Sequence, residues 1–130
     1  ALLRNRTGKF VSKNVHLVRA SGLSTMTAGL SETGVYQIPI AHGEGRYHAD
    51  EDTLKSLNDK GQVMFRYAEA DGAITPEANP NGSAQNIAGV CNESRNVMGM
   101  MPHPERAADF ELENTDGREI FESILQIVNA

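Results

Sequence analysis

The stretch GVCNESRNVMGMMPHPER, residues 89–106, decides how the second half of this chain folds. Two short apolar runs, NIAGVC and NVMGMM, flank the turn sequence NESR. Such runs around a polar turn predict a β-hairpin, with the only cysteine, Cys91, at the end of its first strand. His103, Pro104 and Glu105 follow the second strand directly, so we expect them where a strand leaves the sheet.

Three segments before the hairpin have the composition of strands. Residues 10–18, 35–42 and 62–68 are rich in apolar and β-branched side chains, in part near alternation. Pro39 has no N–H to donate to a neighbouring strand, which places its strand at an edge of the sheet or at its end. Residues 69–85 concentrate Asp-Gly, Asn-Pro and Asn-Gly pairs, which are typical of consecutive turns.

Two segments predict helices. In the first, Asp50 is a candidate N-cap and Gly61 can lie just past the end. The second, residues 115–128, is amphipathic, and residues 19–34 predict a loop with at most one short helical turn. The side chains expected to be buried on the second helix are Ile120, Phe121, Ile124, Leu125 and Val128. The elements together predict a strand-rich α/β fold with two helices.

The composition excludes several classes of protein. The net charge is −5 and the 12 Lys and Arg residues are scattered, which disfavours nucleic-acid binding. No apolar run approaches the roughly 20 residues needed to cross a bilayer, so we expect no membrane segment. One cysteine cannot form an internal disulfide, which favours a reducing cytoplasm. The first residue is Ala and strand-like sequence begins almost at once, so we expect a piece of a longer protein.

His103 and Glu105 carry the chemistry that is easiest to interpret. Residues i and i+2 of an extended backbone project from one face, so the two side chains can lie side by side. A carboxylate that accepts from one imidazole nitrogen leaves the other nitrogen free to take a proton from a thiol or hydroxyl. The alternative is a surface histidine and glutamate at a proline-rich strand exit.

Two further sites are conceivable. Cys91 precedes strand sequence, whereas a catalytic cysteine of this kind is usually followed by a helix that lowers its pKa. A buried, inert cysteine is therefore the favoured interpretation. A metal site is the other possibility, although no His-x-x-x-His spacing supports it. Its candidate ligands would be His42, Glu44, His48, His103 and Glu105.

Several motifs carry a family resemblance. IPIAHGEGRY and ANPNGSAQNIAGVCNESRNVMGMMPHPERA resemble the C-terminal half of the glutaminase subunits of phosphoribosylformylglycinamidine synthase. His-Pro-Glu is shared by class I, triad-type glutamine amidotransferases generally, whereas HGEGR, NPNGS and MMPHPER in this order are specific to the purine-pathway branch. The resemblance implies that residues 1–130 are the C-terminal part of a flavodoxin-like α/β amidotransferase domain.

That resemblance also implies an activity. The family hydrolyses glutamine with a Cys-His-Glu triad and passes ammonia to a synthetase that amidates formylglycinamide ribonucleotide in purine biosynthesis. His103 would be the general base and acid, and Glu105 would orient it. The family's nucleophile lies in a Gly-x-Cys-Asn-Gly elbow that does not occur in this chain, so the 130 residues alone are expected to be inactive.

The same resemblance suggests roles for residues outside the triad. The backbone near His42 and Gly43 would contact the bound glutamine, with a glycine turn and a satisfied histidine as the alternative. The residues implied at the interface with the synthetase are Glu44, Arg46 and Asn81. A small accessory subunit is a further implied partner. ATP and magnesium are expected in the synthetase and no cofactor or metal in this chain. A non-catalytic module that docks on a synthetase is the alternative function.

Overall fold

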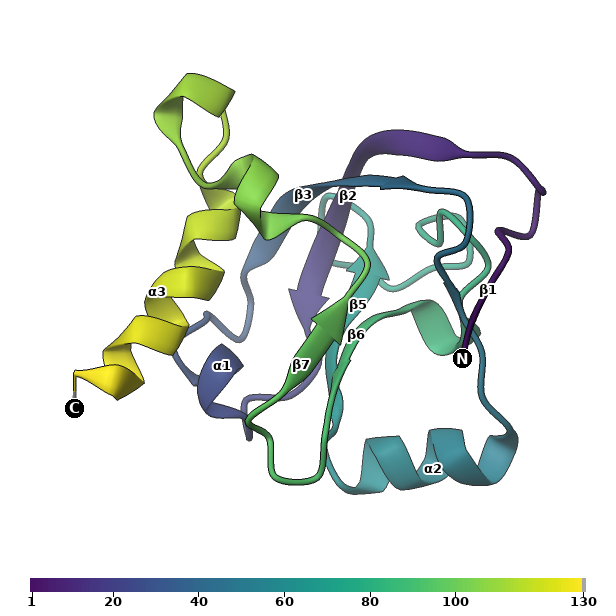
Figure 1. Cartoon of the computed structure of the whole chain (residues 1–130), viewed down its shortest axis with the longest axis horizontal. Helices are drawn as coiled ribbons and strands as arrows, with labels where there is room; N and C mark the ends of the chain where they lie inside the picture. Colours follow the sequence, from purple (N-terminus) through teal and green to yellow (C-terminus); the bar gives the residue numbers. More distant parts are fainter. Residues whose placement is uncertain (130) are drawn as a thin grey trace.

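A five-stranded antiparallel sheet is the centre of the molecule (Figure 1). The structure is a computed structural model that describes residues 1–129, apart from the side chains of residues 127 and 128. The strand order is β3-β2-β5-β6-β7, and a short separate ribbon pairs β1 with β4. The strands are β1 Leu2–Leu3, β2 Val11–Arg19, β3 Val35–His42, β4 Arg46–Tyr47, β5 Val63–Ala68, β6 Ile87–Cys91 and β7 Met98–Met100. The parallel strands of a flavodoxin-like fold are not found among these pairings.

Helices and short 3-10 turns surround the sheet and complete an α/β fold, as expected. The helix α3 lies against α1 and β3 in Figure 1, whereas α2 lies at another end of the molecule. The bounds are α1 Thr25–Ala28, η1 Ala84–Asn86, α2 Glu51–Asp59, η2 Pro104–Ala107, η3 Phe110–Leu112 and α3 Asp116–Val128. Among the described residues, no helix is long and apolar enough to cross a membrane.

The edge position predicted from Pro39 is confirmed, because β3 is the outermost strand on its side of the sheet. The even-numbered residues of β3 are buried in strict alternation, and His42 is the last of them. Tyr36, Ile38 and Ile40 in this inward row pack with Leu17 and other residues of the core. The imidazole of His42 therefore continues the row of buried apolar side chains at the end of β3.

The hairpin predicted from residues 89–106 is also confirmed. Gly89 pairs with Met100, and Cys91 pairs with Met98. The connecting turn includes Arg95 in the left-handed region, at φ 56°. Cys91 is buried at the end of β6, as expected.

The first predicted helix begins and ends as the sequence indicates. The Asp50 carboxylate accepts from the backbone N–H of Thr53 at 2.7 Å, which satisfies one of the free donors of the first turn. Gly61 follows the end of α2 at φ +64°, a conformation that glycine adopts at little cost.

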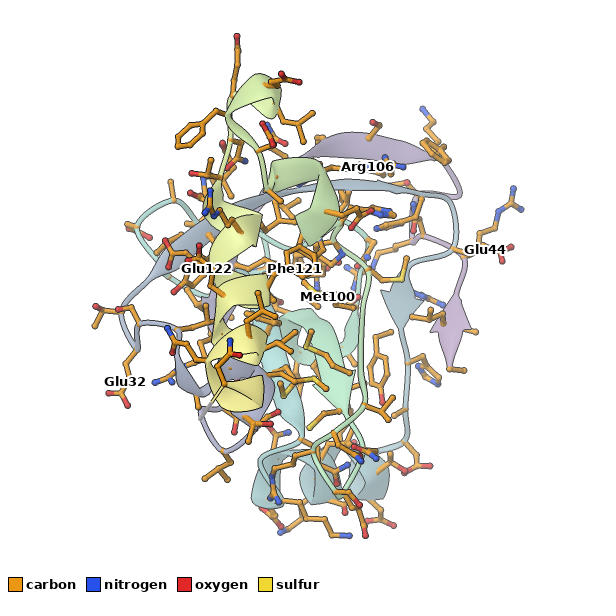
Figure 2. All side chains as sticks on the ribbon, turned by 60° about the vertical axis from the view of Figure 1, so that its left-hand side comes forward. Glu32, Glu44, Met100, Arg106, Phe121 and Glu122 are labelled. Atoms are coloured by element: carbon orange, nitrogen blue, oxygen red, sulfur yellow. The ribbon has the colours of Figure 1, made fainter. Side chains whose placement is uncertain are left out.

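The burial predicted for α3 is partly wrong. Ile120 is buried, but Phe121 and Leu125 keep 39% and 55% of their surface exposed. The side chain of Phe121 is labelled on α3 in Figure 2. The buried stripe instead runs through Gly117, Ile120 and Ser123, because these positions face β3, η2 and α1. Measured from Ile120, positions 121 and 125 lie about 100° and about 140° further round the helix. Ile124 is only half-buried, and the Val128 side chain is outside the described part.

Candidate functional site

His103 lies where the chain leaves β7 and crosses to the edge strand β3. Its backbone N–H donates to the carbonyl oxygen of Pro39 at 2.8 Å, which fixes the turn against the sheet edge. Pro104 then begins the 3-10 turn η2, where its lack of an N–H costs nothing. The backbone N–H of Arg106 donates to the carbonyl of His103 at 3.1 Å and closes that turn.

The predicted contact between His103 and Glu105 is present. His103 Nδ1 lies 2.8 Å from Glu105 Oε1, and the two side chains are 32% and 58% exposed. The extended backbone conformation that was predicted to bring them together is wrong, because Pro104–Ala107 form a 3-10 turn. An ionised carboxylate can only accept, so Nδ1 carries the hydrogen. Nε2 has no hydrogen bond to any residue that the structure describes, and a reacting group can use it.

The charges around Glu105 favour its ionised form. Partial burial alone would raise the pKa of Glu105, but its own backbone N–H, the hydrogen bond from His103 and the positive charges nearby together lower it. Arg106 contributes one of those charges, with Nε 4.0 Å from Glu105 Oε1. Glu105 is therefore an acceptor that holds the imidazole in one tautomer.

His42 belongs to a buried polar network. It is only 6% exposed, with Nδ1 3.0 Å from Asn5 Oδ1 and Nε2 3.4 Å from Asn81 Nδ2. The Asn81 amide can only donate to Nε2, so Nδ1–H donates to Asn5. Burial, assisted by the charge of His103 and opposed by a hydrogen bond to its own backbone, lowers the pKa of His42. The ring is neutral and fully engaged, which fits the satisfied-histidine alternative.

Asn5 organises the backbone beside His42. Its side-chain NH₂ donates to the carbonyl oxygens of His42 and Lys9, both at 2.8 Å, and its Oδ1 also accepts from the Gly45 N–H at 3.2 Å. Its own N–H donates to the carbonyl of Gly43 at 2.9 Å. These carbonyl oxygens of His42 and Gly43 are thus satisfied internally, and their predicted contact with glutamine stays a prediction. Asn5 was not predicted as a site residue, because nothing in its NRTGK context distinguishes it from an ordinary turn residue.

The interface role of Asn81 stays a prediction, and within this chain its side chain has a structural role. Its side chain is directed inward and is 2% exposed, because it bridges the HGEGR turn and the NPNGS loop. Glu44, by contrast, is exposed and extends from the rim of the molecule in Figure 2. Arg46 is half-buried on β4 opposite Leu3. Interface roles for Glu44 and Arg46 stay predictions.

The alternative sites suggested by the sequence are not assembled. Burial raises the pKa of the Cys91 thiol, although the charge of Arg95 and a backbone hydrogen bond act in the opposite direction. A thiol of this kind is a poor nucleophile. Among the residues that the structure describes, no three or more His, Cys, Asp or Glu side chains gather closely enough to hold a metal ion.

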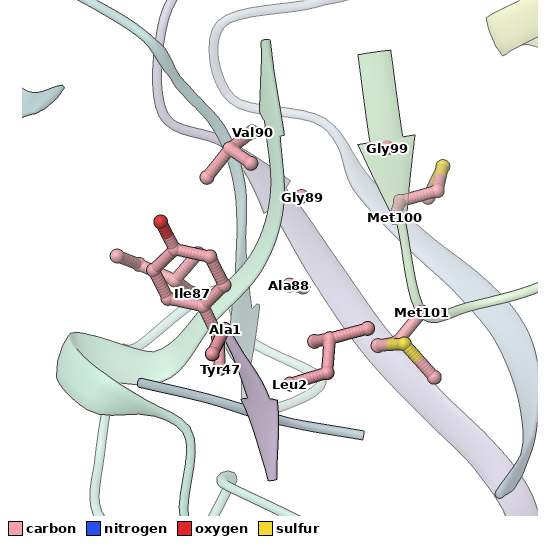
Figure 3. A pocket seen from close by; sticks show the side chains of 10 residues that line it. All are labelled: Ala1, Leu2, Tyr47, Ile87, Ala88, Gly89, Val90, Gly99, Met100 and Met101. Carbon is pink, nitrogen blue, oxygen red and sulfur yellow. The ribbon is translucent and has the colours of Figure 1, made fainter. Parts of the chain in front are cut away.

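An open apolar pocket of about 270 Å³ lies beside the hairpin (Figure 3). Its walls include Leu2, Tyr47, Ile87, Met100 and Met101, and His103 and Glu105 are not among the residues that line it. Such a lining suits apolar side chains better than a polar small molecule.

Known proteins with similar sequences are named as subunits of phosphoribosylformylglycinamidine synthase. The chain is 53% identical over 125 residues to the phosphoribosylformylglycinamidine synthase subunit PurQ of Koribacter versatilis, covering 96% of this chain and 54% of that subunit. It is 52% identical over 121 residues to the same subunit of Synechocystis, covering 93% and 54% of the two chains. The chain thus spans about half the length of the curated relatives it matches.

A solved structure and a family model agree with these relatives. A chain in the structure of PurLQS from Thermotoga maritima superposes with a TM-score of 0.79 and 39% identity, over 98% of this chain and 52% of that one. The model of the CobB/CobQ-like glutamine amidotransferase domain matches residues 1–125. The chain therefore belongs to the CobB/CobQ-like glutamine amidotransferase family.

Proposed function

We propose that this chain is the part of a glutaminase that supplies the general base and the residue that orients it. The observation that carries the proposal is the 2.8 Å contact between His103 Nδ1 and Glu105 Oε1, with Nε2 left open. In such a pair the carboxylate fixes the tautomer, and Nε2 can remove a proton from a thiol and return it to a leaving group.

The proposed reaction is hydrolysis of the glutamine side-chain amide. A cysteine outside these 130 residues transfers its proton to His103 Nε2, and the thiolate attacks the amide carbon. The imidazolium then protonates the departing ammonia, and water, activated by the same nitrogen, releases glutamate from the thioester. Cys91 does not take the nucleophile's role, because it is buried in the hairpin.

The relatives extend the proposal to a complex. Their names support a role in phosphoribosylformylglycinamidine synthase, in which the ammonia amidates formylglycinamide ribonucleotide for purine biosynthesis. We propose the synthetase and a small accessory subunit as partners, with ATP and magnesium bound by the synthetase. The proposed compartment is the cytoplasm, where an unpaired cysteine is ordinary.

The test is ammonia release from glutamine. The chain is co-expressed with the segment of the Koribacter versatilis subunit that it does not match, and each part is also assayed alone. We expect activity only in the combination, and we expect His103→Asn to reduce it by at least about 1,000-fold. Glu105→Gln should reduce it less, whereas Cys91→Ser should leave it unchanged.

Two results would contradict this assignment. Activity that survives His103→Asn would remove the base from His103, and activity lost in Cys91→Ser would make Cys91 the nucleophile. A combination that binds the synthetase but releases no ammonia, even with intact residues, would favour the non-catalytic docking module.

A further inference from the structure

The first turn of α3 makes an unusually close contact with the turn that carries the His103–Glu105 pair. A Cβ atom built on Gly117 would lie 2.1 Å from the carbonyl oxygen of Pro104 and 2.8 Å from its Cα and carbonyl carbon. Real Cβ atoms essentially never approach another atom within 3.0 Å. All three opposing atoms belong to the backbone or ring of a proline, so no side-chain rotation can relieve the overlap.

The residues just before Gly117 attach the same turn of α3 to the edge strand. Asp116 Oδ2 accepts from the backbone N–H of Gln37 at 2.8 Å. Asn114 Nδ2 donates to the carbonyl oxygen of Gln37, also at 2.8 Å. One residue of β3 is thus held by both its backbone groups, two positions before the Pro39 carbonyl that accepts from His103.

These contacts form a closed arrangement. The edge of β3 holds the backbone of His103 at one point and the start of α3 at another, and Gly117 then contacts the Pro104 carbonyl. Pro104 is the residue between His103 and Glu105, so a displacement of Pro104 moves both partners of the 2.8 Å contact.

We infer that Gly117 is a positioning residue for the His103–Glu105 pair, acting through the backbone of Pro104. Its missing Cβ allows the helix to press the 3-10 turn into the geometry in which the carboxylate reaches Nδ1. Asn114 and Asp116 set the distance at which the helix does so. The geometric part of this inference is independent of the proposed function, and its consequence for catalysis rests on that function.

The size of the effect follows from the overlap. Gly117→Ala requires Pro104 and α3 to separate by about 1 Å, and a misplacement of that size can cost about 100-fold in rate. A 2.8 Å hydrogen bond lengthened by a similar amount is no longer a hydrogen bond. The matched control is Gly99→Ala, because a Cβ on Gly99 meets nothing within 4 Å.

The experiment is measurement of the ring ¹⁵N shifts of His103 in the 130-residue chain, which distinguish the two neutral tautomers. We expect the Nδ1–H tautomer to dominate in the parent chain and in Gly99→Ala, and to lose its dominance in Gly117→Ala. A variant that unfolds would change the shifts of residues throughout the chain and not those of His103 alone, so thermal unfolding is recorded beside the ¹⁵N shifts. If Gly117→Ala does not fold, Asp116→Ala tests the same displacement by removing the acceptor of the Gln37 N–H.

An unchanged His103 tautomer in a folded Gly117→Ala chain, or in Asp116→Ala where that variant replaces it, would overturn the inference. In the complemented glutaminase, the expected result is a kcat about 100-fold lower with KM unchanged. A changed tautomer with unaltered kcat would leave the positioning role intact and refute the assignment of His103 as the base, so the two failures are distinguishable.

Discussion

Replacement of Asn81 by alanine is expected to destabilise the chain by about 3 kcal/mol, because it leaves buried polar groups without partners. The Asn81 amide donates to the Gly45 carbonyl at 2.9 Å and lies 3.4 Å from both Tyr67 Oη and His42 Nε2. Its carbonyl oxygen accepts from Ser83 Oγ at 2.7 Å and from the Ser83 N–H at 3.0 Å.

The magnitude depends on which of these groups keep another partner. The Ser83 N–H also donates to Asn79 Oδ1, and Ser83 Oγ also donates to the Gly45 carbonyl. The two polar groups of Ser83 and the Gly45 carbonyl therefore keep a hydrogen bond when Asn81 is replaced. Tyr67 Oη and His42 Nε2 lose the only contact they make among the described residues. A buried polar group left without a partner costs about 1–3 kcal/mol. Tyr67 Oη and His42 Nε2 are two such groups, and because both contacts are long, at 3.4 Å, we place their summed cost in the lower half of the summed range, at about 3 kcal/mol.

The assay is urea unfolding of Asn81→Ala beside Asn92→Ala. Asn92 is the matched control, because it makes three hydrogen bonds within a turn but is exposed. Water replaces its bonds, so its loss should cost about 1 kcal/mol or less. A similar loss of stability in the two variants, at an unchanged slope with urea, would refute the structural role of Asn81.

Three shorter predictions concern burial and backbone conformation. Cys91 should react with a thiol reagent only after unfolding, since burial both covers it and raises its pKa; rapid labelling of the native chain would contradict this. The lowered pKa of His42 means that its contribution to stability is complete above the ordinary value near 6.5 and declines at lower pH, by at most about 1.4 kcal/mol per pH unit. Urea unfolding between about pH 7 and pH 5 should show that this slope is smaller in His42→Gln, and equal slopes would exclude the effect. Gly61→Ala should cost about 1–2 kcal/mol, because φ is +64° there, and an unchanged melting temperature would show that the backbone relaxes freely.

Local patterns were sufficient for most of the fold. The hairpin of β6 and β7 and the cap at Asp50 depend on residues a few positions apart, so their signals are complete within the sequence. The exposed face of α3 was not predictable in that way. The helical spacing of apolar residues shows that a helix has an apolar face, but not which side of the helix another element covers. The small residues Gly117 and Ser123, which lie on the buried side, carry no hydrophobic signal.

The candidate site shows the same division. His103 and Glu105 could be paired from their spacing alone, even though the 3-10 turn that joins them was not foreseen. The partners of His42 lie 37 and 39 residues away in turn-like segments, and nothing in those segments indicates a shared contact. The interface role of Asn81 was implied by the family resemblance alone, and the sequence around it indicated only consecutive turns.

The turn that carries the His103–Glu105 pair also covers part of the open edge of β3. An open strand edge invites pairing with other chains, and proteins usually cover or interrupt it. On β3 the interruption is Pro39, and the covering groups are the His103 N–H and the side chains of Asn114 and Asp116. The same contacts that close this edge hold the pair, so a substitution that frees the edge should disturb the imidazole as well. Stability and the proposed chemistry are therefore coupled at β3, which explains why a half-exposed pair can keep a defined geometry.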